Sequence, residues 1–178
     1  ISIVGVSDGA YYNTNVTVNV TITEQNLVNS DLKLNGVTYN FAEDINLSTE
    51  GYYYLYAYAE DEAGWTASEI VSFVIDKTAP TVSYILSGTA NVNGEYASRA
   101  TVSLSAYDML SGLSSIEYQL DDGAWTTYTE PVTITGAGTH VFNYTATDNA
   151  GNTYTGTIEI VIISTAFPLV ADFSYSPA

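Results

Sequence analysis

The chain has 178 residues, with 20 Asp and Glu against three Lys and Arg, so its formal net charge is −17. Such a surface repels phosphate backbones and anionic lipid, which argues against a nucleic-acid or membrane-surface partner. Cysteine is absent, which excludes disulfides, thiol catalysis and Cys-type zinc sites. No apolar run approaches the roughly 20 residues of a membrane-spanning helix, so we expect no membrane insertion.

The first half of the chain has the pattern of β-strands. Residues 1–4 have the pattern of a β-strand and not of a signal peptide. Because the sequence begins directly with this strand, we expect the chain to be part of a longer protein. Asn35-Gly36 predicts a hairpin between apolar strands. Residues 16–22 alternate with period two, so their apolar members share one face: Val16, Val18, Val20 and Ile22.

The second half continues this pattern after a short linker. Pro80 ends the linker 76–80 and cannot donate to a β-ladder, so we expect one domain to end near it. Residues 101–106 alternate like 16–22, and Asp122-Gly123 predicts another hairpin turn. No stretch of the sequence has sustained helical periodicity with caps.

One segment of the chain occurs twice. Residues 51–76 align without a gap with residues 138–163, at an offset of 87 residues, and Asp61 falls on Asp148. A repeat of this length suits a small all-β domain. We therefore predict an all-β fold with two tandem β-sandwich domains of about seven short antiparallel strands each. The predicted domains span 1–78 and 79–166, and 167–178 would be a linker and the start of a further domain.

Several motifs of the second repeat occur together: Ser111-Gly112-Leu113, residues 116–125, Tyr128, Gly138 and residues 144–152. They resemble a bacterial Ig-like repeat family named after a leptospiral outer-membrane protein. The first repeat resembles the broader bacterial Ig-like group, with Trp65 where the motif has Asn. Residues 171–178 are similar to the start of a PKD-like domain. These resemblances imply Ig-like spacers and binding units of adhesins, S-layer proteins and secreted polysaccharide-active enzymes.

Catalysis has little support in the sequence. The only histidine, His140, lies in an aromatic-rich strand, where we expect a packed or half-exposed side chain. Adjacent carboxylates such as Asp121 and Asp122 lie in a predicted turn, where they usually serve the turn itself. No nucleophile elbow, H-E-x-x-H, Walker or G-x-G-x-x-G motif occurs. We expect no catalytic site.

Carboxylates near the linker raise the question of a metal. Calcium takes about six to eight oxygen ligands from flexible loops. The linker also resembles the calcium-rigidified linkers of bacterial adhesin repeats, which implies Glu60, Asp61 and Asp76 as ligands, with Asp108 or Asp121 as donors from the second repeat. The alternative is that Asp61 and Asp148 accept backbone N–H groups in Asx turns without an ion. Both interpretations stay open, and Ca²⁺ is the only cofactor that the sequence suggests.

Two sets of residues are candidates for surface roles. Four asparagines in N-x-S/T sequons are candidate glycosylation sites, of which we expect half or fewer to be used: Asn15, Asn19, Asn46 and Asn143. Four tyrosines share the outer face of one strand: Tyr52, Tyr54, Tyr56 and Tyr58. They either pack across strands or, with Trp65, form a contact surface for a sugar or a neighbouring protein. The other face of that strand, with Leu55, Ala57 and Ala59, is the expected core.

These features favour non-catalytic structural and interaction modules of a larger extracellular surface protein, of adhesin or S-layer type. The modules would be rigid spacers, stiffened by calcium and glycosylated. The lack of cysteine favours a prokaryotic host. The expected partners are neighbouring domains of the same chain, other copies of the surface protein, or glycans. The alternative is an accessory carbohydrate-binding segment of a secreted glycan-active enzyme.

Overall fold

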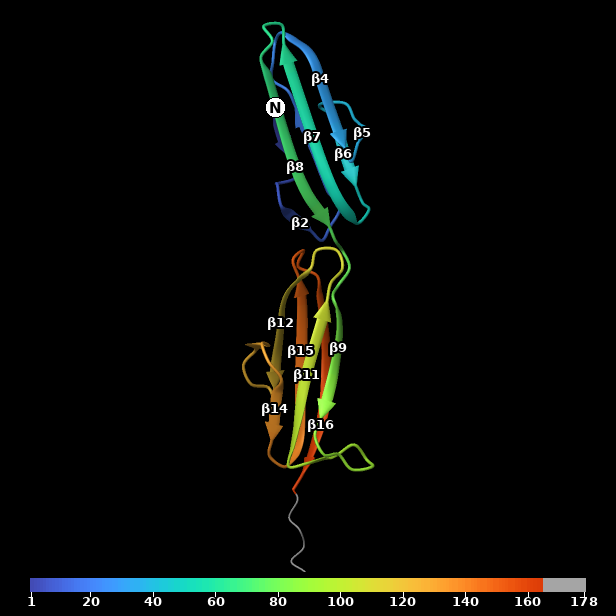
Figure 1. Ribbon diagram of the computed structural model, residues 1–178, viewed down its shortest axis with the longest axis vertical. Helices are drawn as coiled ribbons and strands as arrows, with labels where there is room; N and C mark the ends of the chain where they lie inside the picture. The colour runs from blue at the N-terminus through green and yellow to red at the C-terminus, as the bar shows by residue number, and fades with distance from the viewer. Residues whose placement is uncertain (165–178) are drawn as a thin grey trace, which may run out of the picture. The chain divides into compact units, whose positions relative to one another are not determined.

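The computed structural model describes residues 1–164 (Figure 1). Sixteen β-strands, β1–β16, lie in four sheets that make two sandwich-like domains. Within this part of the chain there is no helix long and apolar enough to cross a membrane. The predicted all-β tandem sandwich is thus confirmed, with eight strands in each repeat instead of about seven. The predicted start of a PKD-like domain lies outside the described residues.

The chain divides into two compact units whose borders differ from those of the sequence repeats. The first unit comprises Ile1–Val82 together with two segments of the second repeat, Ala106–Glu117 and Thr145–Thr155. The second unit comprises, among the described residues, Ser83–Ser105, Tyr118–Tyr144 and residues 156–164. The domain borders expected from the sequence stay predictions.

The first repeat forms one three-stranded and one five-stranded sheet. The smaller sheet has the order β1 (Ser2–Val4), β3 (Val16–Thr21), β6 (Asp44–Leu47). The larger sheet has the order β2 (Ala10–Tyr12), β8 (Thr66–Ile75), β7 (Gly51–Asp61), β4 (Leu27–Leu34), β5 (Val37–Thr38). Neighbouring strands are antiparallel except β2 and β8, which pair in parallel.

Alternating side chains build the core of the first repeat. Val18 and Val20 of β3 and Leu55 of β7 are fully buried in it. Tyr53 stacks on Phe73 with ring centroids 5.2 Å apart, a pairing that adds to the free energy of area burial. The expected inward faces of both strands are confirmed, although β3 ends at Thr21 and leaves Ile22 half-buried beyond it.

The second repeat has the same plan. Its smaller sheet has the order β14 (Val132–Thr135), β11 (Arg99–Tyr107), β9 (Thr81–Ser87). Its larger sheet has the order β10 (Tyr96–Ala97), β16 (Thr153–Ile163), β15 (Gly138–Asp148), β12 (Leu113–Leu120), β13 (Thr126–Thr127). Phe142 of β15 is fully buried and stacks on Tyr118 of β12, with ring centroids 5.1 Å apart.

The sequence repeat corresponds to a structural one. β7 and β15 each have 11 residues and begin at a glycine with positive φ, 150° at Gly51 and 143° at Gly138. Each strand ends at the aspartate of the D-x-A-G loop, and a long strand follows it, β8 or β16. The offset of 87 residues therefore relates equivalent strands.

Two local predictions need correction. The strands are not all antiparallel, because the short strands β2 and β10 run parallel to β8 and β16. The second hairpin turn lies one residue earlier than expected. Its central residues are Asp121 and Asp122, which both have positive φ (48° and 57°), and the Gly123 amide donates to the Leu120 carbonyl over 2.9 Å. Aspartate tolerates this left-handed conformation better than most residues do.

Candidate metal centre

Three buried aspartates converge within the first unit. Asp76, Asp108 and Asp148 each offer a carboxylate oxygen, and these atoms all lie within 4.8 Å of one another. Their exposed fractions are 0%, 7% and 2%. Aspartate is rarely buried to this extent without a partner, so the cluster is the most unusual chemical feature of the described chain.

Asp76 is placed by the end of β8. Its backbone amide donates to the Tyr12 carbonyl over 2.8 Å, next to the parallel β2–β8 pair. Its Oδ1 accepts the Thr78 amide at 3.0 Å and its Oδ2 accepts the Ser111 amide at 2.9 Å. The carboxylate therefore has a fixed orientation.

Asp108 directly follows β11 and organises the loop after it. Its Oδ1 accepts the backbone amides of Leu110, Ser111 and Gly112 at 3.1, 2.9 and 2.8 Å. Gly112 has a φ of 80°, a conformation that glycine adopts without steric cost. The loop thus wraps around one carboxylate oxygen and brings Ser111 to Asp76.

Asp148 is the last residue of β15. Its Oδ1 accepts the Asn152 amide and its Oδ2 accepts the Asn152 side-chain Nδ2, both at 2.8 Å. The same Nδ2 donates to the Asp76 carbonyl oxygen, also at 2.8 Å. Asn149 Nδ2 donates to the Ser111 carbonyl at 2.7 Å. Asp148 therefore accepts a backbone N–H group of its own loop, as expected, but the donor is Asn152, four residues on, and not the residue two positions on that defines an Asx turn. Asn152 and Asn149 join this loop to Asp76 and to the loop of Asp108.

Hydrogen bonding favours the charged form of Asp76. Burial alone raises the pKa of Asp76, but hydrogen bonds from Ser111 and from the Thr78 amide, with a smaller one involving Asp108, outweigh it and lower the pKa overall. Ionised carboxylates about 4 Å apart repel each other by about 4 kcal/mol at an effective dielectric constant of about 20. A cation at the centre of the cluster would relieve this repulsion.

Within residues 1–164, no protein cation forms an ion pair with the three aspartates. The ion pairs found within residues 1–164 join Lys33 to Asp31 and His140 to Asp121. Lys77 follows Asp76 in sequence, but its Nζ donates to Asn15 Oδ1 at 2.6 Å and to the Ser48 carbonyl at 2.5 Å. The cluster therefore offers only oxygen atoms as metal ligands, which suits a hard cation such as calcium or magnesium.

The structure brings together two of the five predicted metal ligands, Asp76 and Asp108. Glu60 and Asp61 lie at the end of β7 beside a separate hollow that Trp65 also lines. Asp61 Oδ1 accepts the amides of Ala63 and Trp65, both at 2.9 Å, which is the Asx turn expected there. Asp121 lies at the β12 turn and pairs with His140.

Sequence reasoning did not assign Asp148 to the metal. The offset of 87 residues aligned it with Asp61, a predicted ligand, so a signal was present. The two aligned residues differ in their surroundings, because Asp148 is 2% exposed and joins the cluster while Asp61 does not.

His140 is half-exposed, as expected. Its Nδ1 lies 2.6 Å from Asp121 Oδ2 and its Nε2 lies 3.1 Å from the Gly136 carbonyl oxygen. The hydrogen bond to Asp121, and then that to Gly136, raise the pKa of His140. The hydrogen bond from His140, and then that from the Val141 amide, lower the pKa of Asp121.

The predicted surface residues lie at or near the surface. Tyr52 and Tyr54 are exposed by 65% and 48% and Trp65 by 78%, while Tyr56 and Tyr58 are half-buried. Asn15 and Asn46 are exposed, and Asn19 and Asn143 are half-buried. Asn19 Nδ2 donates a hydrogen bond to Asp44, and Asn143 Nδ2 donates one to Gln119.

No family model matches the chain, and no curated protein matches it. Several solved structures are similar to it, among them the following three. The fibronectin(III)-like modules of Clostridium thermocellum CbhA are 13% identical, with a TM-score of 0.47, over 92% of this chain and 94% of that one. Bacteroides ovatus SGBP-B of a mixed-linkage glucan utilization locus, in complex with a mixed-linkage heptasaccharide, is 16% identical, with a TM-score of 0.32, over 91% and 47%. Dimeric latent PorU of Porphyromonas gingivalis is 14% identical, with a TM-score of 0.32, over 92% and 20%. All three TM-scores lie below 0.5, so the fold is assigned from the strand order and pairing of the sheets described above and not from these similarities.

Proposed function

We propose that the chain is a pair of non-catalytic structural modules of a larger extracellular prokaryotic surface protein, of adhesin or S-layer type, in which they act as spacers. Each repeat has its own two sheets and its own buried residues. The segment after β8 is held locally, because Glu50 Oε1 accepts the Lys77 amide at 2.5 Å and the Thr78 hydroxyl at 2.9 Å. Such a tethered segment suits a load-bearing connection better than a flexible one.

The cluster of Asp76, Asp108 and Asp148 binds one divalent cation in this proposal, and calcium fits best. Calcium accepts carboxylate oxygens in irregular arrangements, whereas magnesium demands a near-octahedral shell with several waters. The observation that carries the proposal is the convergence of three buried carboxylates, with which no cation of the described part of the chain forms an ion pair. A bound ion would join the segments that follow β8, β11 and β15.

Isothermal titration with CaCl₂ tests this site. We expect a single site in the chain and its loss in Asp148→Asn, which keeps the shape of the side chain but removes its charge. Glu159→Gln is the matched control, because Glu159 is an exposed carboxylate of β16 outside the cluster. Absence of binding in the parent chain, or unchanged binding in Asp148→Asn, would refute the assignment.

Glycosylation is proposed at Asn15 and Asn46. Both are exposed, whereas Asn19 and Asn143 are half-buried and their Nδ2 atoms, to which a glycan would be attached, already donate hydrogen bonds. Intact mass after expression in a glycosylating prokaryote tests the proposal, with Asn15→Gln and Asn46→Gln removing the added mass. Glycans at Asn19 or Asn143 instead would contradict this ranking.

A second candidate function is favoured by the exposed tyrosines of β7. An accessory carbohydrate-binding segment needs accessible aromatic rings. Tyr52 and Tyr54 are both exposed, and the Tyr52 ring is also held by the hydrogen bond from its hydroxyl to the Leu110 carbonyl. This candidate is compatible with a spacer role, because the aspartate cluster and the outer tyrosine face share no residue, although Tyr52 lies beside Asp76 and Asp108.

A further inference from the structure

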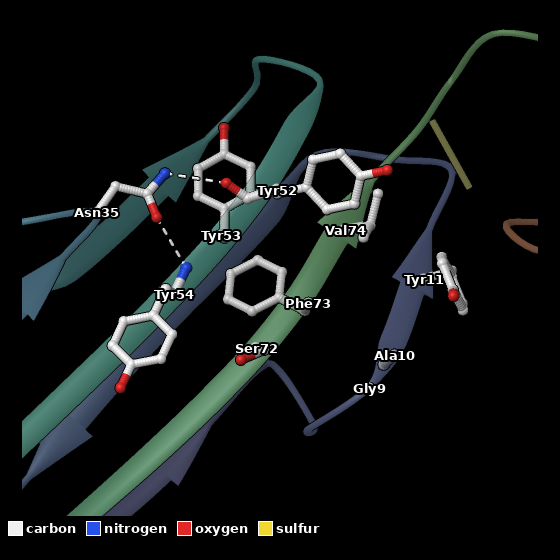
Figure 2. A pocket seen from close by; sticks show the side chains of 10 residues that line it. All are labelled: Gly9, Ala10, Tyr11, Asn35, Tyr52, Tyr53, Tyr54, Ser72, Phe73 and Val74. Carbon is white, nitrogen blue, oxygen red and sulfur yellow. Dashed lines mark hydrogen bonds between the residues drawn. The ribbon is translucent and has the colours of Figure 1, made fainter. Parts of the chain in front are cut away.

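The tyrosine face of the first repeat contains a hollow of about 410 Å³. Figure 2 shows Tyr52 and Tyr54 on β7 and Tyr11 on β2, with β8 and its residues Ser72 and Val74 between them. This volume lies within the range of about 300–1,000 Å³ that small-molecule sites occupy.

The register of the strands explains why the hollow forms. Val74 pairs with Tyr11 on one side and with Tyr52 on the other, and paired residues share a face of the sheet. The next row holds Tyr54 and the small Ser72, beside which the Gly9 amide donates to the Ser72 carbonyl at 2.7 Å. A row with a serine and a glycine beside three large rings leaves space that side chains do not fill.

The walls of the hollow are held in place before any ligand binds. Asn35 Nδ2 donates to the Tyr52 carbonyl at 3.0 Å, and Asn35 Oδ1 accepts the Tyr54 amide at 2.8 Å (Figure 2). The Tyr52 hydroxyl donates to the Leu110 carbonyl at 2.8 Å, which fixes the ring. Asp8 Oδ1 accepts the Ser72 amide at 2.8 Å and so lies beside the hollow. Preorganised walls reduce the entropy cost of binding.

We propose that this hollow binds a pyranose unit of a neutral saccharide. The rings of Tyr11, Tyr52 and Tyr54 are exposed by 43%, 65% and 48%, and offer apolar faces to the C–H face of a sugar. The hydroxyls of Tyr54 and Ser72 and the carboxylate of Asp8 offer polar groups to sugar hydroxyls. The net charge of −17 disfavours uronic acids and other anionic sugars. The inference rests on the second candidate function and names its ligand class and position.

The chain is titrated with cellohexaose, maltohexaose, mannohexaose and xylohexaose, and with the hexamer of galacturonic acid as the anionic probe. Amide chemical shifts are recorded by NMR. At least one neutral hexaose should shift the amides of Gly9, Tyr11, Tyr54, Ser72 and Val74, and its affinity should fall at least tenfold in Tyr54→Ala. Ser72→Phe, which fills the hollow from an exposed position, should abolish binding without disturbing the core.

Tyr84→Ala is the matched control, since Tyr84 of β9 is also 48% exposed but lies outside the hollow. The inference is overturned if no neutral hexaose shifts these amides, if both hollow variants bind like the parent, or if the galacturonic acid hexamer binds equally well. Tighter binding of tetramethylammonium than of any hexaose would also overturn it. The calcium titration measures a different ligand. If no saccharide binds, the spacer function and the calcium site are therefore still judged by the calcium titration alone.

Discussion

The side chain of Asn152 connects two of the three buried aspartates, because its Nδ2 lies 2.8 Å from both the Asp76 carbonyl oxygen and Asp148 Oδ2. One amide group thereby ties the end of β8 to the loop after β15. In the first repeat, the position 87 residues earlier is Trp65, which is 78% exposed. The two D-x-A-G loops therefore differ at the residue that makes this connection.

Replacing Asn152 should destabilise the protein measurably. Asn152→Ala removes both side-chain hydrogen bonds and leaves buried acceptors without a donor, which costs about 1–3 kcal/mol. Asn29→Ala, on the exposed part of β4, should change stability by less than about 0.5 kcal/mol. Urea unfolding followed by circular dichroism measures both, and equal effects would show that Asn152 does no more than a surface residue.

Truncating a buried side chain of the second repeat should lower the free energy of unfolding as much as it does in the core of a compact domain. Phe142→Ala deletes a fully buried ring that stacks on Tyr118 and should cost about 3–5 kcal/mol. Its neighbour Val141 is 38% exposed, so Val141→Ala is the control, with an expected cost below about 1 kcal/mol. Similar costs for the two variants in calorimetry would contradict the assigned faces of β15.

Gly5 and Gly9 separate backbone strain from a steric clash. Both have positive φ, 97° and 72°, so alanine is strained at either position. Only at Gly5 would a Cβ atom also meet the protein, 1.9 Å from the Thr17 carbonyl oxygen, while nothing lies within 4 Å at Gly9. Gly5→Ala should therefore be less stable than Gly9→Ala by about 1–3 kcal/mol in urea unfolding. Equal losses of stability would show that Gly5, after β1, does not lie against the Thr17 carbonyl of β3.

The pair of His140 and Asp121 should make stability depend on pH. The raised pKa of His140 gives stability that is fully present below its unfolded pKa of about 6.5 and is lost as pH rises through the folded value. The lowered pKa of Asp121 gives stability that is present above about 3.9 and is lost as pH falls through the folded value. The full contribution, about 0.5 kcal/mol for a partly exposed pair, lies between about pH 4 and 6.5.

His140→Gln isolates this contribution. The parent should exceed the variant in unfolding free energy by more at about pH 5.5 than at about pH 9, because the contribution of the raised His140 pKa is lost as pH rises through the folded value. A difference that stays constant between the two pH values would show that the pair stabilises the fold only through packing.

The elements that the sequence predicted are those whose signal is local. The alternation at 16–22, the Asn35-Gly36 turn and the inward face of Leu55 depend on neighbouring residues alone, and the structure confirms them. The parallel pairing of β2 has no such signal, because three residues are too few for a periodic pattern.

The aspartate cluster was predictable only in part for the same reason. The linker begins at Asp76, and its resemblance to adhesin linkers implied Asp76 as a ligand and Asp108 as a donor from the second repeat. Asp148 has the D-x-A-G pattern of Asp61, and each carboxylate accepts a backbone N–H group of its own loop. Their difference comes from the segments of 106–117 and 145–155 that lie with Asp76 in the first unit, a tertiary relationship without a local signal.

The most direct test of the calcium proposal is the effect of Asp108→Asn on the unfolding free energy with and without Ca²⁺. With EDTA the variant should be at least as stable as the parent, because one of three repelling charges is gone while the side-chain oxygen still accepts hydrogen bonds. With Ca²⁺ at about 100 times its dissociation constant, the parent should gain about 2.7 kcal/mol and become the more stable protein. If the parent gains nothing from Ca²⁺, or the variant gains as much, the three aspartates do not form a calcium site.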